Sequence, residues 1–219
     1  MYRHTRDEMI QTITREVAMT GAMTGRATLS SRVMKAMVDV PRERFVPRHL
    51  RADAYGNFPL PIGNGQTISQ PFIVALMTDL LETRPEHRVL EVGTGSGYQT
   101  AVLASLVEQV YSLELRPELT GTAQRLLEQL GYRNVTLRSA DGYLGWQEYA
   151  PYDAIMVTAA APEVPEALLE QLKVGGYLVI PVGAPYQRQE LLRLHKDVSG
   201  RVTIDELLGV AFVPLVHGH

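Results

Sequence analysis

Apolar positions follow two different periods along this chain, and the change comes after about residue 82. Before that point, three stretches carry apolar residues at helical spacing, namely residues 5–20, 29–39 and 71–82. Ser30 or Ser31 suits the N-cap of the second stretch, and Pro71 suits the first turn of the third. We therefore expect residues 1–82 to form an N-terminal helical cap.

The chain between the second and third helical stretches follows neither period. The segment ADAYGNFPLPIG, residues 52–63, is expected to be irregular, and GNGQTISQP, residues 63–71, follows it as a loop. Gly63, Asn64 and Gly65 tolerate the positive φ that such a loop requires. Turn chemistry does not explain the polar residues that come next, which are Thr67, Ser69 and Gln70.

From Arg88 onward the chain carries short apolar runs rich in β-branched residues. These runs are RVLEV, QVYSLEL, NVTLRSA, YDAIMVTA and GGYLVIPVG, and stretches with a helical pattern separate the first three. This alternation predicts βαβ units in a parallel sheet that is covered on both faces. LLRLHKD and VTIDELLGVAFVPL would add antiparallel strands at the C-terminal edge. We expect residues 83–219 to form a doubly wound, mostly parallel, Rossmann-like α/β domain.

Composition narrows the class of protein. Of 219 residues, 45% are hydrophobic and 21% are charged, which is typical of a globular chain with a sizeable core. No apolar run approaches 18 residues and the N-terminus is charged, so we expect a cytoplasmic protein without a membrane partner. The absence of cysteine excludes disulfides and thiolate chemistry. The net charge of −3 gives no electrostatic reason to expect nucleic acid, and we expect a monomer.

Three glycines follow the first strand of the predicted sheet. Gly93, Gly95 and Gly97 lie on a strand-to-helix turn, where ligands bind in open α/β sheets. Tyr98 stands where a dinucleotide fingerprint has its third glycine, and no Gly-Lys-Ser/Thr follows, which excludes a P-loop. Taken alone, the motif is equally compatible with a simple tight turn.

Acidic residues at successive strand ends favour a ligand at this turn. Glu91 lies two residues before the first glycine, and Glu114 ends the next strand, where its carboxylate can accept hydrogen bonds from ribose hydroxyls or can simply face solvent. Asp141 and Gly142 follow the third strand, where an acid could meet an adenine amino group. Together these positions predict an adenosine ligand without a pyrophosphate.

This arrangement resembles the class I S-adenosylmethionine-dependent methyltransferases, whose first motif is similar to residues 91–97. The chain further resembles the protein-L-isoaspartate O-methyltransferase family over about residues 40–215, through GNGQTISQP, VLEVGTGSGYQTAVLA, YDAIMVTAAAPEVP, LKVGGYLVIPVG and FVPL. The resemblance implies a Rossmann-like methyltransferase sheet, S-adenosyl-L-methionine as cofactor, S-adenosyl-L-homocysteine as product, and isoaspartyl-containing proteins and peptides as substrates. The chain departs from the family at Asn57, where Asp is frequent, and at Ala211, where bacterial members commonly have Arg.

The resemblance also implies which residues form the site. The implied cofactor-binding residues are Ile68, Glu91, Gly93, Gly95, Gly97, Glu114, Leu115, Asp141 and Gly142. Ser69 is implied as the catalytic residue nearest the transferred methyl group, and its alternative role is to N-cap the helix that begins at Pro71. The segments ADAYGNFPLP and AFVPL are expected to form the walls of the substrate groove.

The chemical class of the methyl acceptor decides whether the site needs a group that removes a proton. An amine or hydroxyl acceptor must lose a proton, whereas a carboxylate is already deprotonated at pH 7. Thr158 to Pro162 follow the fourth strand in place of an Asn-Pro-Pro-aromatic motif that would orient an amine, so a carboxylate acceptor fits. Two alternatives remain, a methyltransferase for a small molecule or nucleic acid and a noncatalytic adenosyl-binding module. No metal site is expected, and His217 and His219 are expected to be inert or to bind metal adventitiously, without a catalytic role.

Overall fold

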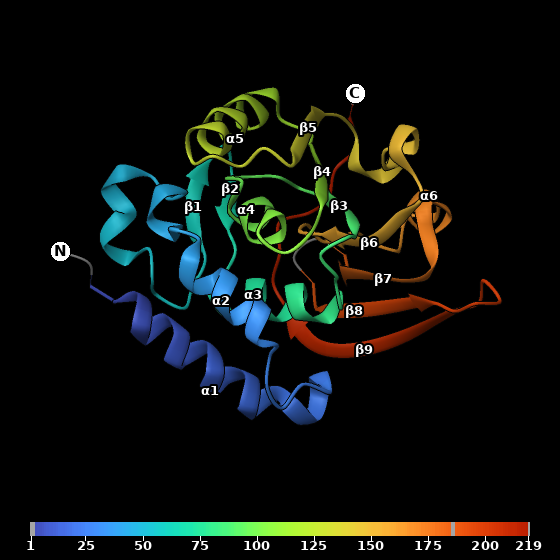
Figure 1. The fold of residues 1–219 in the computed structure, drawn as a ribbon, viewed down its shortest axis with the longest axis horizontal. Helices are drawn as coiled ribbons and strands as arrows, with labels where there is room; N and C mark the ends of the chain where they lie inside the picture. The colour runs from blue at the N-terminus through green and yellow to red at the C-terminus, as the bar shows by residue number, and fades with distance from the viewer. Residues whose placement is uncertain (1–2, 185–186, 219) are drawn as a thin grey trace.

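A computed structural model describes residues 3–184 and 187–218, and these residues form a mostly parallel sheet flanked by helices (Figure 1). The sheet has seven strands in the order β5-β4-β3-β6-β7-β8-β9. Its strands are β3 Arg88–Val92, β4 Gln109–Glu114, β5 Val135–Ser139, β6 Tyr152–Val157, β7 Leu172–Val182, β8 Gln189–Lys196 and β9 Val202–Val210. β3 to β7 pair in parallel, and β8 and β9 are antiparallel. The predicted fold class is therefore confirmed.

Six α-helices surround this sheet in the described part of the chain. They are α1 Arg6–Thr24, α2 Ser31–Asp39, α3 Pro71–Leu80, α4 Tyr98–Ala104, α5 Pro117–Gln129 and α6 Glu166–Gln171. Short 3₁₀ turns form η1 Arg42–Arg44, η2 Arg48–Asp53, η3 Gly142–Leu144 and η4 Gln147–Tyr149. Ser30 is the N-cap of α2, and its hydroxyl accepts a hydrogen bond from the Val33 N–H at 3.3 Å. None of the described helices is both long and apolar enough to cross a lipid bilayer.

The central strands β3, β4 and β6 are buried almost throughout, and because successive strand residues point to opposite sides, both faces of the sheet are covered there. In β3, Val89 packs in the cluster that contains residues of α1 to α5, whereas Leu90 packs in a second cluster with Trp146 and Leu168 of α6. Figure 1 shows α1, α2 and α4 on one side of β3, β6 and β7, and α6 on the other side. The near-continuous apolar runs of the sequence are explained by this double burial.

One buried core joins the N-terminal helices to the glycine turn. Arg42 is fully buried, its Nε donates to the Ala54 carbonyl at 2.7 Å, and its guanidinium lies 4.9 Å from the centre of the Tyr98 ring. Burial lowers the pKa of Arg42 to about 10. Because Tyr98 is the first residue of α4, the cap packs directly against the helix that follows the glycine turn.

The expectation of irregular backbone is wrong for residues 60–68, which form a β-hairpin. β1 Leu60–Gly63 pairs with β2 Gln66–Ile68 in antiparallel fashion. Asn64 and Gly65 have φ of 52° and 70°, as their turn chemistry predicts. A two-residue turn with positive φ reverses the chain tightly, so the strands on either side meet despite the prolines that weaken the strand pattern.

Candidate functional site

The glycine turn lies at the carboxyl end of β3, beside β6, where the order of strands reverses along the chain. Gly93, Gly95 and Gly97 have φ of 102°, 52° and 85°, in the left-handed region that favours glycine. A Cβ atom on Gly93 would lie 2.3 Å from the Thr158 hydroxyl oxygen, so a larger residue would displace Thr158. The Gly93 N–H donates to the Leu113 carbonyl at 2.7 Å, which fixes the turn against β4.

Glu114 lies beside this turn at the end of β4. One of its carboxylate oxygens accepts a hydrogen bond from the Gly95 N–H at 2.9 Å, and the other accepts one from the Arg116 N–H at 3.0 Å. A carboxylate has about four acceptor positions, so each oxygen keeps capacity for a further donor. The structure therefore holds an oriented anion next to the turn that can still bind two hydroxyl groups.

Glu91 is fully buried beneath the same turn. Its Oε2 accepts hydrogen bonds from Thr100 at 2.5 Å and Ser112 at 2.6 Å, while its Oε1 has no partner among the described residues. Burial raises the pKa of Glu91 to about 7, although these two hydrogen bonds oppose the shift. Ser112 also contacts Thr94 at 2.6 Å, so Glu91 supports the turn through a chain of hydroxyl groups.

Two adjoining cavities lie at this edge of the sheet. The inner cavity, of about 70 Å³, is lined by Gln66, Thr67, Val92, Gly93, Gly95, Leu113, Glu114, Leu115, Arg116, Ala140, Gly142, Thr158, Ala159, Val213, Pro214, Leu215 and Val216. The outer cavity, of about 380 Å³, is lined by Pro59, Thr67, Ser69, Gln70, Ile73, Thr158, Arg188, Gln189, Gly209, Val210, Ala211, Phe212 and Val213. They share Thr67, Thr158 and Val213, so a ligand in one cavity can meet a ligand in the other.

Ser69 lines the outer cavity, and the structure assigns the N-cap position of α3 to Gln70 instead, without a side-chain capping bond. The Phe72 N–H in the first turn of α3 donates to the Asn57 side-chain oxygen at 3.1 Å. The alternative in which Ser69 caps this helix is therefore wrong. Its half-buried hydroxyl is placed at the wall of the cavity by the end of the β1–β2 hairpin.

The described residues that line the outer cavity include no group suited to remove a proton. Among the described residues that line it, Arg188 is the one ionisable side chain, and neither a carboxylate nor a histidine nor a lysine is present. Pro59 and residues 211–213 form part of its wall, as expected for the segments ADAYGNFPLP and AFVPL. This cavity suits an acceptor that arrives already deprotonated.

The predicted cofactor residues divide into two groups. Those that line the inner cavity are Gly93, Gly95, Glu114, Leu115 and Gly142. The others lie outside its lining: Ile68 is buried in the core, Glu91 lies beneath the turn, Gly97 is the N-cap residue of α4, and Asp141 contacts the C-terminal segment. Lining a cavity does not by itself assign a role, so a cofactor role stays a prediction for both groups.

Asp141 contacts both its own turn and the distant C-terminal segment. Its carboxylate accepts hydrogen bonds from the Tyr143 N–H at 2.9 Å and the Gly218 N–H at 3.0 Å, and contacts His217 Nδ1 at 3.2 Å. Burial opposes ionisation, but these contacts outweigh it and hold the pKa of Asp141 below its usual value. The His217 ring also stacks on Tyr143 at 3.9 Å, so His217 is not free of contacts, while His219 lies outside the described residues.

The C-terminal segment is the part of the site that sequence reasoning placed least well. Residues 213–216 line the inner cavity, although FVPL was expected only at the substrate groove. The Ala160 N–H donates to the Val213 carbonyl at 2.8 Å, and the Leu215 N–H donates to the Ala160 carbonyl at 2.7 Å, which holds the segment beside β6. Arg188 and Gln189 carried no motif that would have marked them as site residues.

The sheet order, the glycine turn and the oriented carboxylate at the next strand end define a class I S-adenosylmethionine-dependent methyltransferase. No group of three or more possible metal ligands exists among the described residues. The family model for protein-L-isoaspartate(D-aspartate) O-methyltransferases matches residues 15–219, and the chain belongs to this family.

Known proteins of this family match along almost the whole chain. A Syntrophobacter fumaroxidans protein named protein-L-isoaspartate O-methyltransferase 2 is 53% identical over 218 residues, which cover 100% of this chain and 88% of that protein. A solved protein-L-isoaspartate O-methyltransferase has a TM-score of 0.80 at 29% identity, covering 96% of this chain and 65% of that one. A Plasmodium falciparum protein of the same description, solved with S-adenosyl-L-homocysteine, has a TM-score of 0.79 at 25% identity and covers 98% of this chain and 99% of that one. The chain is thus an enzyme that uses S-adenosylmethionine as methyl donor.

Proposed function

We propose that this enzyme methylates the free carboxylate of L-isoaspartyl residues in damaged proteins, with the cofactor in the inner cavity and the acceptor in the outer one. The ester would cyclise to a succinimide, whose hydrolysis restores some normal aspartyl linkages. The shared residues Thr67, Thr158 and Val213 are the place where the two cavities adjoin. Transfer there requires only that the acceptor be held in line with the donor.

The residues of the inner cavity suit S-adenosylmethionine. The Glu114 carboxylate can accept further hydrogen bonds from the two ribose hydroxyls of the cofactor. Because Gly93 and Gly95 have no side chains, the amino-acid portion of the cofactor can approach their backbone closely. When bound, the cofactor supplies a methyl group that the sulfonium charge has already activated. The protein's own contribution is therefore binding and orientation.

The observation that carries the proposal is the absence of a proton acceptor among the described residues that line the outer cavity. A carboxylate needs no deprotonation at pH 7, so this lining suits it, whereas an amine or hydroxyl acceptor would need help that these residues do not give. In our proposal, the Ser69 hydroxyl donates a hydrogen bond to the acceptor carboxylate and orients it. Ser69 acts neither as a nucleophile nor as a base.

A methyl-incorporation assay tests this function. An isoaspartyl peptide and its normal aspartyl twin carry the same charge and differ only in where the main chain leaves the carboxylate. We expect transfer to the isoaspartyl peptide at a rate far above that for the twin, because the outer cavity must recognise backbone shape. Equal rates on the two peptides, or methylation of RNA or a small molecule but neither peptide, would contradict the proposal.

We further propose that residues 1–82 form an N-terminal helical cap with the substrate loop, and that residues 83–219 form the α/β domain that binds S-adenosylmethionine. The β1–β2 hairpin supports this division, because it brings Thr67 and Ser69 to the outer cavity. We also propose that the enzyme acts as a cytoplasmic monomer without a nucleic-acid partner. The net charge of −3 supports the last point, and light scattering of the purified chain tests the oligomeric state.

A further inference from the structure

Arg188 lies at the rim of the outer cavity and is the one charged side chain among the described residues that line it. Its side chain is 86% exposed, and its Nε contacts the Glu190 carboxylate. An exposed ion pair of this kind is weak and exchanges partners readily. The guanidinium is thus available to a second anion that approaches the cavity.

The wall beneath Arg188 is fixed. Gln189 is only 4% exposed, its side-chain Nε2 donates to the Phe212 carbonyl at 3.1 Å, and its Oε1 accepts from the Phe212 N–H at 2.7 Å. These two bonds join β8 to the segment after β9. Arg188 therefore extends from an anchored neighbour, and only its side chain needs to move to meet a ligand.

A polypeptide that presents its acceptor to Ser69 leaves the outer cavity across its rim, and Arg188 is part of that rim. The outer cavity, at about 380 Å³, has room for the acceptor residue, but the chain on either side must leave it. Neighbouring residues along an extended chain are spaced by about 3.3 to 3.6 Å, so the residues next to the acceptor cross the rim first.

Building on the proposed function, we propose that Arg188 makes the enzyme selective for isoaspartyl residues that have an acidic side chain beside them in the sequence. An adjacent carboxylate pairs with the guanidinium, a neutral neighbour gains nothing, and an adjacent lysine is repelled. Glu190 competes with the substrate for Arg188 and moderates the preference. The neighbour, not the acceptor carboxylate, is the partner of this arginine.

Peptides that differ in one flanking residue test this inference. Isoaspartyl peptides carrying Glu, Gln or Lys next to the acceptor, on the N-terminal or the C-terminal side, are compared by kcat/KM. At low ionic strength we expect the Glu peptide to exceed the Gln peptide by about two- to fivefold on at least one side, as for an exposed ion pair. The preference should shrink at about 1 M salt, where charges are screened beyond about 3 Å.

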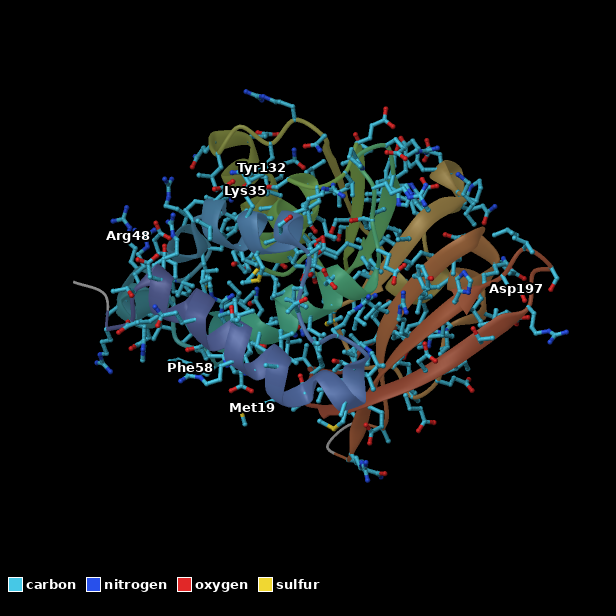
Figure 2. All side chains as sticks on the ribbon, turned by 60° about the horizontal axis from the view of Figure 1, so that its bottom comes forward. Met19, Lys35, Arg48, Phe58, Tyr132 and Asp197 are labelled. Carbon is cyan, nitrogen blue, oxygen red and sulfur yellow. The ribbon has the colours of Figure 1, made fainter. Side chains whose placement is uncertain are left out.

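Three variants separate the possible origins of such a preference. Arg188→Gln should abolish it, and Glu190→Gln should increase it by freeing the guanidinium. Arg201→Gln is the matched control, because Arg201 is an exposed arginine at the opposite end of the same hairpin, next to the turn that Asp197 marks in Figure 2. This control should leave the preference unchanged.

The outcomes assign each failure to its own cause. Equal kcat/KM for the Glu and Lys peptides in the wild-type enzyme, or a preference that persists in Arg188→Gln, would overturn the inference. An equal loss on all peptides in Arg188→Gln would also overturn it, by assigning Arg188 to the acceptor carboxylate. If the wild-type enzyme methylates none of the isoaspartyl peptides, the proposed function itself fails. If Arg188→Gln does not fold, the inference is tested by two other results. The preference of the wild-type enzyme must shrink at high salt, and Glu190→Gln must increase it.

Discussion

Glu91 and Glu114 lie on neighbouring strands at the same end of the sheet, yet their surroundings differ. Glu114 reaches a cavity and receives two backbone N–H groups, whereas Glu91 is sealed in the core with two hydroxyl partners. A buried carboxylate without a cationic partner is costly when ionised. We therefore expect the same type of side chain to bind a ligand on one strand and to respond to pH on the next.

Glu91 should make stability depend on pH. Its pKa is about 7 in the folded state and about 4.5 in the unfolded chain, so between these values the folded state binds more protons. The stabilisation is therefore complete below pH 4.5 and is lost as pH rises through 7, by at most about 3 kcal/mol. Glu91→Gln, which resembles the protonated acid, should lack this loss and should be more stable than the wild type at pH 8.

Denaturant unfolding at several pH values between 5 and 8 measures the effect. The matched control is Glu170→Gln, which changes an exposed glutamate in α6 and should follow the wild-type curve. A wild-type stability that does not fall over this range, or a Glu91→Gln variant that falls equally, would show that Glu91 is not the responsible group.

Ser69 should matter for turnover and not for stability. Loss of one well-placed hydrogen-bond donor from a transition state costs about 10²- to 10³-fold in rate, and we expect Ser69→Ala to lose at most this much. Its melting temperature should stay close to that of the wild type, because Asn57 and not Ser69 binds the first turn of α3. Turnover on an isoaspartyl peptide and thermal unfolding measure the two effects.

Ser30→Ala is the matched control for Ser69→Ala. Ser30 caps α2, so its loss should lower the free energy of unfolding by about 0.5 to 2 kcal/mol and leave turnover of the folded enzyme intact. The assignment of Ser69 would be wrong if the two variants showed the reverse pattern, with Ser69→Ala less stable and fully active.

At the scale of elements, the C-terminal segment forms one side of the inner cavity, and we expect it to control access to that cavity. The cavity is about 70 Å³, below the roughly 300 Å³ or more of usual ligand pockets, so we expect its wall to move when an adenosyl group binds. Residues 213–216 form one side of it, and beyond them the segment is held by the contacts of His217 and Gly218 with Asp141. These outer contacts are exposed and are the weakest part of the wall.

His217→Ala should therefore make the cofactor enter and leave faster. We expect both rate constants for S-adenosyl-L-homocysteine to rise by about two- to fivefold, as for loss of an exposed contact, with a smaller change in Kd. His195→Ala is the control, since His195 also stacks on a tyrosine, Tyr177 at 4.6 Å, but belongs to β8 away from the inner cavity. Stopped-flow binding that finds both variants unchanged would exclude the gating role.

The elements that the sequence predicts well are those whose pattern is local. RVLEV is predicted as a strand because it is a short, β-branched apolar run, and its last four residues are buried. Ser30 is predicted as a cap because its partner, the Val33 N–H, is three residues away. The β1–β2 hairpin was missed because Pro59 and Pro61 interrupt the alternation that marks a strand. A turn signal was present at Asn64 and Gly65, and it alone pointed to the hairpin.

At the scale of the whole molecule, the site depends on contacts that no local pattern encodes. Asn57 and Phe72 are fifteen residues apart, and Asp141 meets Gly218 across 77 positions. The glycine turn and Glu114 could be predicted because strand ends of a parallel sheet share an edge. The position of Arg188 and the path of residues 213–216 follow from how the last strands return to that edge, which a single sequence does not specify.

The outer cavity is assembled from both ends of the chain, from Pro59 to Ile73 on one side and from Arg188 to Val213 on the other. During synthesis on the ribosome, the glycine turn and its neighbouring strands emerge well before residues 209–213. A nascent chain can therefore form the glycine turn and its neighbouring strands while it still lacks part of the outer cavity. Methyl transfer should begin only after the last strand has left the exit tunnel and folded back, so a product cut short by premature termination before β9 would be without repair activity.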